Sequence, residues 1–316
     1  MPNWIMPNRI MPDRLPDSGA PEAHRCGTAA LVGRPNVGKS TLLNALIGWR
    51  LSIAGPKPQT TRHRILGVLT RPQGQILFLD TPGMHRDGGR AINRQLNRAA
   101  RQAIAQADVA VQVIEAGRWS GEDQLVWEAL AQSTQPRLLA LNKVDAKKDK
   151  KQLLPFIAQV CETHAYDAVY LVSARRRDGL IELESGILQR LPVAPPNFAA
   201  DELTDRSERF LAAELVREQV MLRLAQELPY AATVEIDDFR EGENRAEIEA
   251  SIWVEREGQK GIVIGAGGAQ LKAIGSAARR AMEQVFERRV YLRLWVKVRE
   301  NWSDDEAALR RFGYSD

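Results

Sequence analysis

Gly33-Arg-Pro-Asn-Val-Gly-Lys-Ser40 is the stretch that decides the fold. It has the spacing G-x-x-x-x-G-K-S, in which glycines allow backbone N–H groups to surround phosphate oxygens. The apolar run 28–32 predicts a buried strand before it, and residues 40–47 predict a helix whose N-terminus faces the anion. This context disfavours the alternative, a glycine-rich turn that binds nothing. The stretch therefore predicts a phosphate-binding loop between a strand and a helix.

Outward from this loop, apolar runs of strand length alternate with helical patterns from residue 27 to about residue 191. This alternation predicts an α/β domain with a doubly wound, mainly parallel sheet, whose ligands bind at the carboxyl ends of the strands. Strands are predicted at 28–32, 64–70 (an edge strand), 75–79, 109–114, 138–141 and 169–172. Helices are predicted at 40–47, 91–106, 122–132, 151–163 and 179–189.

The remaining chain divides at segments rich in proline. Residues 1–26 contain three pentads with a proline in each, which predicts a disordered extension and no export signal. Residues 27–191 form the first domain, 192–204 a linker, and 205–316 a second domain with a C-terminal tail. The second domain is predicted to contain a helix from a capping box at Asp205 to about residue 228, strands at 232–237, 246–255 and 290–298, a helix at 269–288, and a short acidic helix at 302–310 that packs on its own domain.

Composition narrows the class of protein and its partners. The 316 residues include only two cysteines and no apolar run long enough to span a bilayer, so we expect a cytoplasmic protein without disulfides. The net charge of +4 is unevenly distributed: −9 over residues 201–257, +7 over 258–299 and −3 over 300–316. This segregation predicts a basic face for a polyanion.

Asn142-Lys-Val-Asp145 follows an apolar strand and indicates which base is bound. A carboxylate at Asp145 can accept hydrogen bonds from the ring N–H and the exocyclic amine of guanine, a donor pair that adenine lacks. Asn142 would brace the neighbouring loops, and the stem of Lys143 would lie along the base. The four residues therefore predict a guanine nucleotide and argue against a P-loop kinase.

Three further segments complete this pattern. Asp80-Thr-Pro-Gly83 also follows a strand, so Asp80 would hold Mg²⁺ through a water and the N–H of Gly83 would contact the γ-phosphate. In Gln59-Thr-Thr-Arg-His63, the hydroxyl of Thr61 is the predicted Mg²⁺ ligand made with triphosphate. Ser173-Ala174 would offer its backbone to the guanine carbonyl oxygen.

Together these segments resemble the five guanine-nucleotide motifs of translation-factor-type small GTPases. With Thr204-Asp-Arg-Ser-Glu-Arg-Phe210, Glu227-Leu-Pro-Tyr230 and Val254-Glu-Arg-Glu-Gly-Gln-Lys260, the chain after residue 26 resembles the bacterial Era family of ribosome-assembly GTPases. The resemblance implies a P-loop GTPase domain followed by a smaller α+β type II KH domain. It also implies recognition of the 3′ end of 16S rRNA during maturation of the small, 30S subunit.

The predicted nucleotide site is as follows. Lys39, Thr61 and Gly83 are the catalytic group, and Ser40, Thr61 and, through water, Asp80 hold Mg²⁺. The residues predicted to bind GTP or GDP are Gly33, Asn36, Val37, Gly38, Lys39, Ser40, Thr41, Asp80, Asn142, Lys143, Asp145, Ser173 and Ala174. Met84 stands where Ras-like enzymes have a glutamine that orients water, so we expect slow intrinsic hydrolysis. Asn36 resembles the asparagine that helps to hold K⁺ in related GTPases, and a loop-bracing role is the equal alternative.

Gly265-Ala-Gly-Gly268 fits the G-x-x-G loop with which KH domains clamp a nucleic-acid backbone. The predicted RNA-binding residues are Gly265, Ala266, Gly267, Gly268, Lys260, Lys272, Arg279 and Arg280. Neither central residue of the loop is basic, which departs from the usual KH pattern and puts affinity in question more than fold. Arg288, Arg289, Arg293, Lys297 and Arg299 are interpreted mainly as a solvated face.

Two functions from different classes remain open on sequence alone. The first is a GTP-hydrolysing switch that binds rRNA and no DNA. The second is a GTP-gated module whose C-terminal domain docks on protein or on the anionic inner face of the cell membrane. The G-x-x-G loop and the segregated charge favour RNA.

Overall fold

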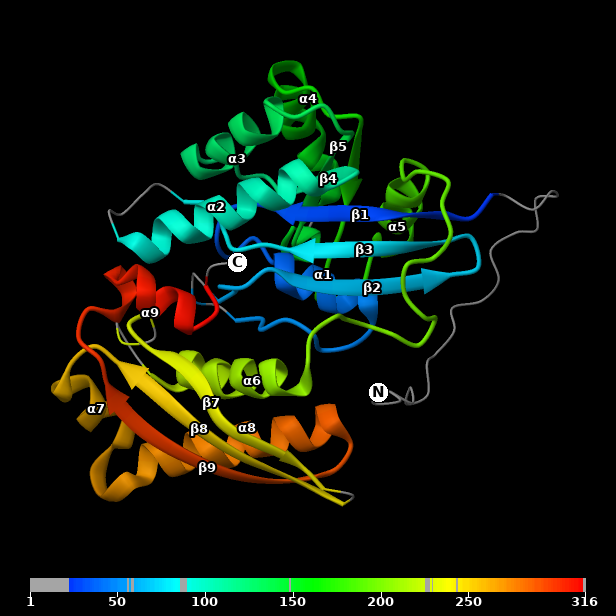
Figure 1. Ribbon diagram of the computed structural model, residues 1–316. Helices are drawn as coiled ribbons and strands as arrows, with labels where there is room; N and C mark the ends of the chain where they lie inside the picture. Colours follow the sequence, from blue (N-terminus) through cyan, green and yellow to red (C-terminus); the bar gives the residue numbers. More distant parts are fainter. Residues whose placement is uncertain are drawn as a thin grey trace.

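The computed structural model describes residues 23–55, 57, 60–85, 90–147, 149–224, 228, 230–242 and 244–314. The predicted proline-rich pentads within 1–22, and the motif residues Gln59, Glu227 and Pro229, lie outside this range. The described residues form two domains, each built around its own sheet (Figure 1). No helix among them is long and apolar enough to cross a membrane.

The first domain contains a six-stranded sheet in the order β2-β3-β1-β4-β5-β6. β2 pairs antiparallel with β3, and the strand order places it at one edge of the sheet, as predicted. The strands are β1 (Arg25–Val32), β2 (Ile65–Arg71), β3 (Gly74–Asp80), β4 (Val109–Glu115), β5 (Arg137–Asn142) and β6 (Ala168–Leu171). Because β1, β3, β4 and β5 run parallel, their carboxyl ends lie along one edge of the sheet.

Helices cover both faces of this sheet. They are α1 (Lys39–Ile47), α2 (Ala91–Gln106), α3 (Gly121–Ala131), α4 (Leu154–Thr163) and α5 (Leu180–Leu188). Apolar residues of α1 and α5 pack on one face, and those of α2 and α3 pack on the other. Successive residues of β1 point to opposite faces of the sheet. Ala29 and Leu31 pack in the same cluster as α1 and α5, and Ala30 and Val32 pack in the same cluster as α2 and α3. The predicted α/β architecture is confirmed.

The linker is more ordered than its proline content suggested. Its backbone follows the free edge of β2: Val68 N donates to Leu203 O over 2.8 Å, and Thr204 Oγ1 donates to Leu66 O over 2.7 Å. At its start, Arg25 and Val193 form an isolated bridge, so β1 begins two residues inside the predicted extension. The connection between the domains is therefore attached to the first domain.

The second domain has the order α6-β7-β8-α7-α8-β9 and a three-stranded sheet, β7-β8-β9. β7 and β8 pair antiparallel, whereas β8 and β9 pair parallel across the intervening helices. The elements are α6 (Glu208–Arg223), β7 (Thr233–Glu241), β8 (Arg245–Val254), α7 (Glu257–Ile264), α8 (Ala269–Phe286) and β9 (Arg289–Val298). This is the connectivity expected of the predicted type II KH domain.

Helix α6 lies between the two domains (Figure 1). Residues 214–221 are all buried, since one side of the helix packs on the KH sheet and the other on the first domain. The helix begins at Glu208 and is capped by Ser207, whose Oγ accepts from Phe210 N at 3.3 Å, so the predicted cap at Asp205 was wrong. It ends at Arg223, earlier than predicted.

Candidate nucleotide site and RNA-binding loop

The predicted phosphate loop joins β1 to α1. Gly38 has a φ of 98°, and a Cβ there would lie 2.4 Å from Asn142 Nδ2, so glycine is required by both conformation and space. Lys39 Nζ lies inside the loop and donates to Gly33 O over 2.9 Å and to Arg34 O over 3.0 Å. Burial lowers the pKa of Lys39 to about 8, against the opposing attraction of Asp80. An anion bound within the loop would offset the energetic cost of burying the charged ammonium group of Lys39.

Oxygen groups gather beside Lys39. Ser40 Oγ lies 2.6 Å from Thr61 Oγ1, which lies 3.4 Å from Asp80 Oδ2. Ser52 Oγ donates to the same carboxylate over 2.8 Å, and sequence reasoning missed Ser52 because it belongs to no motif. Burial raises the pKa of Asp80, and its buried Oδ1 has no hydrogen-bond partner among the described residues. The hydroxyls of Ser40 and Thr61 and the incompletely satisfied carboxylate of Asp80 are hard oxygen donors of the kind that suits Mg²⁺.

A hollow containing about 370 Å³ of empty space, part of it open solvent, lies over this cluster. Its lining includes predicted residues from three segments: Asn36, Gly38, Lys39, Ser40 and Thr41 come from the loop and α1, and Thr61 and Gly83 from the two segments after it. A Cβ on Gly83 would lie 2.7 Å from Pro35 N, so the backbone at Gly83 closely approaches the phosphate loop. The structure therefore brings the three phosphate-facing segments together.

Asn142 braces two loops, as predicted. Its Nδ2 donates to Val37 O over 2.9 Å, and its Oδ1 accepts from Ala174 N at 3.0 Å. The carboxylate of Asp145 accepts from Ser173 Oγ at 2.6 Å, and this hydroxyl is the main reason that the pKa of Asp145 is lowered. An ionised carboxylate held in this position can accept the two donors on guanine. The residues from β5 and those after β6 thus form one corner of the site.

A charged network that sequence reasoning missed joins this corner to the phosphate loop. Lys143 Nζ lies 3.2 Å from Glu115 Oε2, at the end of β4, and Arg34 Nη2 lies 3.3 Å from the same oxygen. Arg34 Nε also pairs with Asp123, at 3.2 Å. The side chain of Asp123 in turn accepts from Ser120 N at 2.9 Å in a capping box at the start of α3. Only the placement of Glu115 directly after an apolar strand could have identified it.

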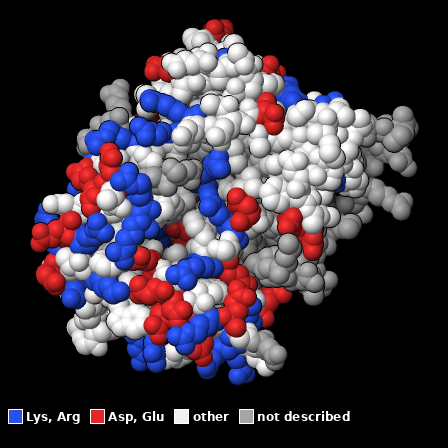
Figure 2. All heavy atoms as spheres, in the orientation of Figure 1, with Lys and Arg blue, Asp and Glu red and all other residues white. Residues whose placement is uncertain are grey.

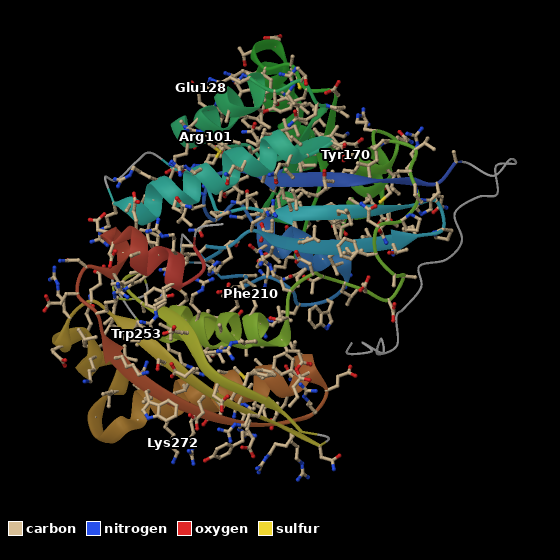
Figure 3. The ribbon with its side chains drawn as sticks, in the orientation of Figure 1. Arg101, Glu128, Tyr170, Phe210, Trp253 and Lys272 are labelled. Carbon is tan, nitrogen blue, oxygen red and sulfur yellow. The ribbon has the colours of Figure 1, made fainter. Side chains whose placement is uncertain are left out.

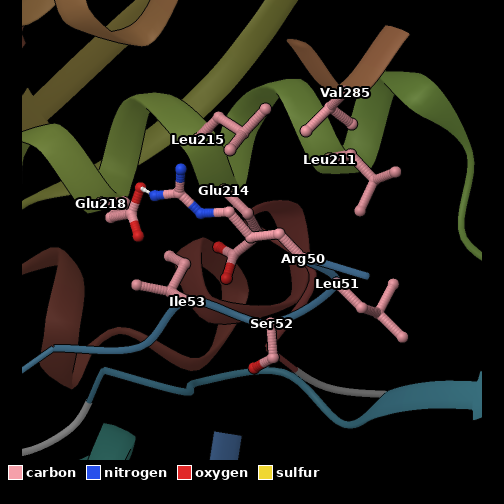
Figure 4. A pocket seen from close by; sticks show the side chains of 9 residues that line it. All are labelled: Arg50, Leu51, Ser52, Ile53, Leu211, Glu214, Leu215, Glu218 and Val285. Carbon is pink, nitrogen blue, oxygen red and sulfur yellow. Dashed lines mark hydrogen bonds and ion pairs between the residues drawn. The ribbon is translucent and has the colours of Figure 1, made fainter. Parts of the chain in front are cut away.

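A separate hollow lies at the domain junction, between residues 50–53 and α6 (Figure 4). Arg50 extends along α6 and pairs with Glu218. Glu214 lies beside it, and apolar side chains such as Leu211 and Leu215 complete the lining. The hollow contains no phosphate-loop residue, so it belongs to the contact between the domains.

The G-x-x-G loop lies between α7 and α8 with the conformation that glycine permits. Gly265, Gly267 and Gly268 have φ values of 72°, 55° and 78°. No atom lies within 4 Å of a Cβ placed on Gly267 or Gly268, so this side of the loop is open. Ala266 is exposed at the tip. The loop can therefore be approached closely by another backbone.

The predicted cations lie on the exposed side of the helices that flank this loop. Lys272, Arg279 and Arg280 are exposed on α8, opposite the buried positions 274, 278 and 282 (Figure 3 labels Lys272). Arg279 pairs with Glu283 at 2.8 Å, and Lys260 of α7 lies 3.7 Å from Glu257. Such exposed pairs are weak and can be exchanged for phosphate.

Four of the five basic residues interpreted above mainly as a solvated face form ion pairs with acidic side chains. Arg288, Arg293, Lys297 and Arg299 form ion pairs with Glu208, Glu249, Asp237 and Asp305, respectively. Figure 2 shows the result, since basic and acidic side chains alternate over the front of the KH sheet instead of forming one basic patch.

Comparison with known proteins identifies the family to which the chain belongs. Residues 28–143 match the family described as 50S ribosome-binding GTPase, and residues 227–303 match the KH domain family. GTPase Era of Stenotrophomonas maltophilia K279a is 56% identical over 291 residues, which are 92% of this chain and 98% of the relative. The chain belongs to the Era family of GTPases. GTPase Era of Xanthomonas oryzae pv. oryzae MAFF 311018 is 57% identical, over 92% of this chain and 97% of its own.

Solved Era structures have the same fold across both domains. A single-residue variant of Aquifex aeolicus Era bound to GDP·AlF₄⁻ is 38% identical, with a TM-score of 0.90 over 92% of this chain and 100% of that chain. Era in complex with MgGDPNP and nucleotides 1506–1542 of 16S ribosomal RNA is 38% identical, with a TM-score of 0.90 over 93% of this chain and 100% of that chain. The predicted family, fold class and GTPase activity are confirmed.

Proposed function

We propose that this chain is a GTP-hydrolysing switch that binds the 3′ end of 16S rRNA and assists assembly of the 30S subunit in the cytoplasm. The observation that best supports this proposal is that Asn142 forms hydrogen bonds with both Val37 and Ala174. These bonds join the phosphate loop to the corner that is proposed to recognise guanine. The Era complex with MgGDPNP and 16S rRNA nucleotides supports the nucleotide and the RNA as partners.

In the nucleotide site, each residue has a role that follows from its position. Lys39 would face the β- and γ-phosphates as a buried cation, Ser40 and Thr61 would ligate Mg²⁺, and the Asp80 carboxylate beside them would hold it through a water. When bound, Mg²⁺ neutralises charge that develops on the phosphate oxygens. Thr61 and Gly83 line the hollow over the phosphate loop, where they would contact the γ-phosphate and respond to its loss. Catalysis on this scheme is positioning plus charge stabilisation.

Hydrolysis by the purified chain should be slow. Met84 is fully buried in the apolar cluster beneath α2, and a thioether cannot orient water as an amide does. We expect fewer than about one turnover per second, near the low end for enzymes. Asn36, which lies within the phosphate loop at a φ of 64°, is our candidate ligand for K⁺. Hydrolysis in KCl and in NaCl at equal ionic strength tests this assignment, and equal rates contradict it.

RNA is assigned to the G-x-x-G loop and to the cations on α8. The loop is open at Gly267 and Gly268, and Lys272 and Arg280 are exposed on the following helix. A four-nucleotide segment clamped at the loop would gain its phosphate neutralisation from these cations. On the surface of the KH sheet, basic and acidic side chains are mixed, so this surface offers no basic area that could bind an anionic membrane. We therefore favour RNA binding over membrane docking as the function of the second domain.

The two sites are connected by contacts between α6 and the segment that carries Thr61. Arg217 donates to Thr60 O, and Lys57 Nζ donates to Met221 O over 2.5 Å. Arg62 Nη1 donates over 2.8 Å to the O of Ala232, the residue just before β7. A movement of Thr61 on loss of the γ-phosphate that carried Thr60 or Arg62 with it would therefore alter contacts with the KH domain. RNA affinity should differ between the GTP-bound and GDP-bound forms.

The test is RNA binding by the full chain loaded with GDP or with a non-hydrolysable GTP analogue. The probes are an oligonucleotide with the 3′-terminal sequence of 16S rRNA, a scrambled RNA of equal length, and anionic vesicles. We expect preferential binding of the first probe in the triphosphate state. Equal affinity for both RNAs would contradict the rRNA assignment, equal affinity in both states would contradict the switch, and binding to vesicles alone would favour the docking module.

A further inference from the structure

The C-terminal tail, residues 301–314, lies between the two domains (Figure 1). The sequence predicts that it packs on its own domain, and it also packs on the GTPase domain. It comprises a short 3₁₀ turn, Trp302–Asp304, and α9 (Glu306–Arg311). Trp302, Leu309, Phe312 and Tyr314 form one buried cluster with Ala91, Ile92 and Leu96 of α2. Trp302 is fully buried, and its Nε1 donates to Ala231 O over 3.0 Å. The tail thus packs α2 against the KH domain.

Asp304 of the tail caps a helix of the other domain. Its Oδ1 accepts from the backbone N of Ala91, the first residue of α2, at 2.7 Å. The residue at the N-cap position of α2 is Arg90, which makes no side-chain capping hydrogen bond. The first N–H groups of a helix have no partner within it, and a carboxylate there also interacts favourably with the helix dipole. The N-terminus of α2 is therefore completed by the second domain.

From α2, hydrogen bonds lead directly to the segment that carries Gly83. Asn97 is 5% exposed, and its Nδ2 donates to His85 O over 2.9 Å while its Oδ1 accepts from His85 N at 3.3 Å. The preceding residue, Met84, donates its N–H to Gly33 O over 3.2 Å. Asn97 therefore fixes the backbone two residues after Gly83, and Met84 ties the same segment to the phosphate loop.

The far end of the tail holds the segment that carries Thr61. The rings of Tyr314 and His63 stack with centroids 4.7 Å apart and an angle of 11°. His63 Nδ1 donates to Gly313 O over 2.9 Å, and Arg62 Nη1 donates to Tyr314 Oη over 3.3 Å. Tyr314 Oη is also 2.7 Å from Thr233 Oγ1 of the KH domain. The tail thus contacts the segment that carries Thr61 directly, and it reaches the segment that carries Gly83 through α2.

We propose that the C-terminal tail positions these two segments for GTP hydrolysis, with Asp304 as a positioning residue that acts through α2 and Asn97. The GTPase domain is then complete only when the tail of the KH domain is docked on it. Because Met84 leaves no glutamine to orient water, the rate depends on how firmly the backbone near Gly83 is held. The inference rests on the proposed assignment of Gly83 to the γ-phosphate.

The test compares variants of the full chain in single-turnover GTP hydrolysis at saturating nucleotide and Mg²⁺. Asp304→Ala should lower the rate about 5- to 10-fold, the equivalent of one lost helix cap. Asp304→Asn should restore most of the rate, because asparagine caps as well as aspartate. GDP affinity should stay within about 2-fold of wild type, because among the described residues the tail packs on α2 and on the segment of Thr61, and not on the guanine corner or the phosphate loop.

Glu306→Ala is the matched control, since it removes the same charge from an exposed residue of the same tail. It should hydrolyse GTP at the wild-type rate. An equal loss in Glu306→Ala and Asp304→Ala, or a parallel loss of GDP affinity in Asp304→Ala, would overturn the proposal. Gly83→Ala separates the two assignments. If Gly83→Ala is inactive while Asp304→Ala is normal, the tail proposal fails alone; if Gly83→Ala is also normal, the Gly83 assignment fails.

Discussion

Lys143 and Glu115 form an ion pair, with Nζ and Oε2 separated by 3.2 Å, at the border between the base and phosphate parts of the nucleotide site. The same carboxylate is shared with Arg34 of the phosphate loop, 3.3 Å away. Lys143 has a φ of 65°, a left-handed conformation that is uncommon for residues other than glycine. Its ammonium group is held by Glu115.

Replacing Glu115 by glutamine should therefore weaken GDP and GTP binding equally. We expect about a 2- to 5-fold increase in Kd, the scale of a partly exposed ion pair, and no change in the hydrolysis rate at saturation. Titration with fluorescent nucleotides measures both affinities. In a Lys143→Met background the substitution should have no further effect, whereas independent losses would contradict the shared role. Glu184→Gln, which removes the Arg71 pair elsewhere on the domain, is the control.

Base specificity should follow Asp145. In Asp145→Asn, one carboxylate oxygen becomes an NH₂ group that opposes the exocyclic amine of guanine. One hydrogen bond is then replaced by a clash of donors and the other loses its charge, so GTP affinity should fall roughly 100-fold or more. Xanthosine triphosphate has an acceptor at the same ring position, so it should bind the variant better than GTP does. Competition between the two nucleotides checks this, and an unchanged preference for GTP would exclude Asp145 as the base-reading group.

Acid should weaken the junction between the domains through His63. Burial lowers the pKa of His63 to about 4, and Glu214 only partly opposes this effect. The charged and polar groups that face the ring are Glu214, Arg217, Arg206 and the carbonyl of Gly313. Because an unfolded histidine titrates near 6.5, the unfolded chain binds a proton that the folded chain does not as the pH falls from about 6.5 to 4, and stability decreases across this range.

Urea unfolding at pH 7.0 and pH 5.0 measures that decrease, with His63→Phe as the comparison. Phenylalanine can keep the stack on Tyr314 but cannot take up a proton. The variant should therefore lose less stability than the wild type between the two pH values. Equal losses would show that His63 does not carry the acid sensitivity.

The sequence predicted the GTPase domain well because its elements are specified locally. Buried parallel strands appear as continuous apolar runs, and α2 was predicted with the bounds that it has, Ala91–Gln106. Helix α7 was missed because Gly258 and Gly261 lower its helix propensity. Its stability comes from tertiary and capping contacts: Val263 is fully buried, and Gln259 Oε1 accepts from Arg256 N at 3.1 Å.

The nucleotide motifs could be located in the sequence because each one needs few residues at a fixed spacing. Ser52 and Glu115 contribute to the same site by contacting residues far from them in the sequence, Asp80 and Lys143 respectively. Neither residue therefore lies in a motif. The position of the C-terminal tail could not be predicted for a similar reason. The apolar residues of 302–314 predict a buried face, but periodicity contains no information on which domain covers it. Contacts between domains are set by the whole fold and not by local pattern.

The composition of the G-x-x-G loop leads to the last prediction. Ala266 is exposed at the tip with a negative φ, so a longer side chain fits without backbone strain, whereas Gly267 at a φ of 55° should remain glycine. Ala266→Lys adds a cation where an RNA backbone would be clamped. RNA affinity should rise several-fold at low salt, and the slope of log affinity against log salt should steepen by about 0.7, one phosphate contact on a single strand. Ala200→Lys, an exposed alanine in the linker, adds the same charge away from the loop. If both variants gain equally, or if Ala266→Lys gains nothing, the RNA backbone does not pass over this loop.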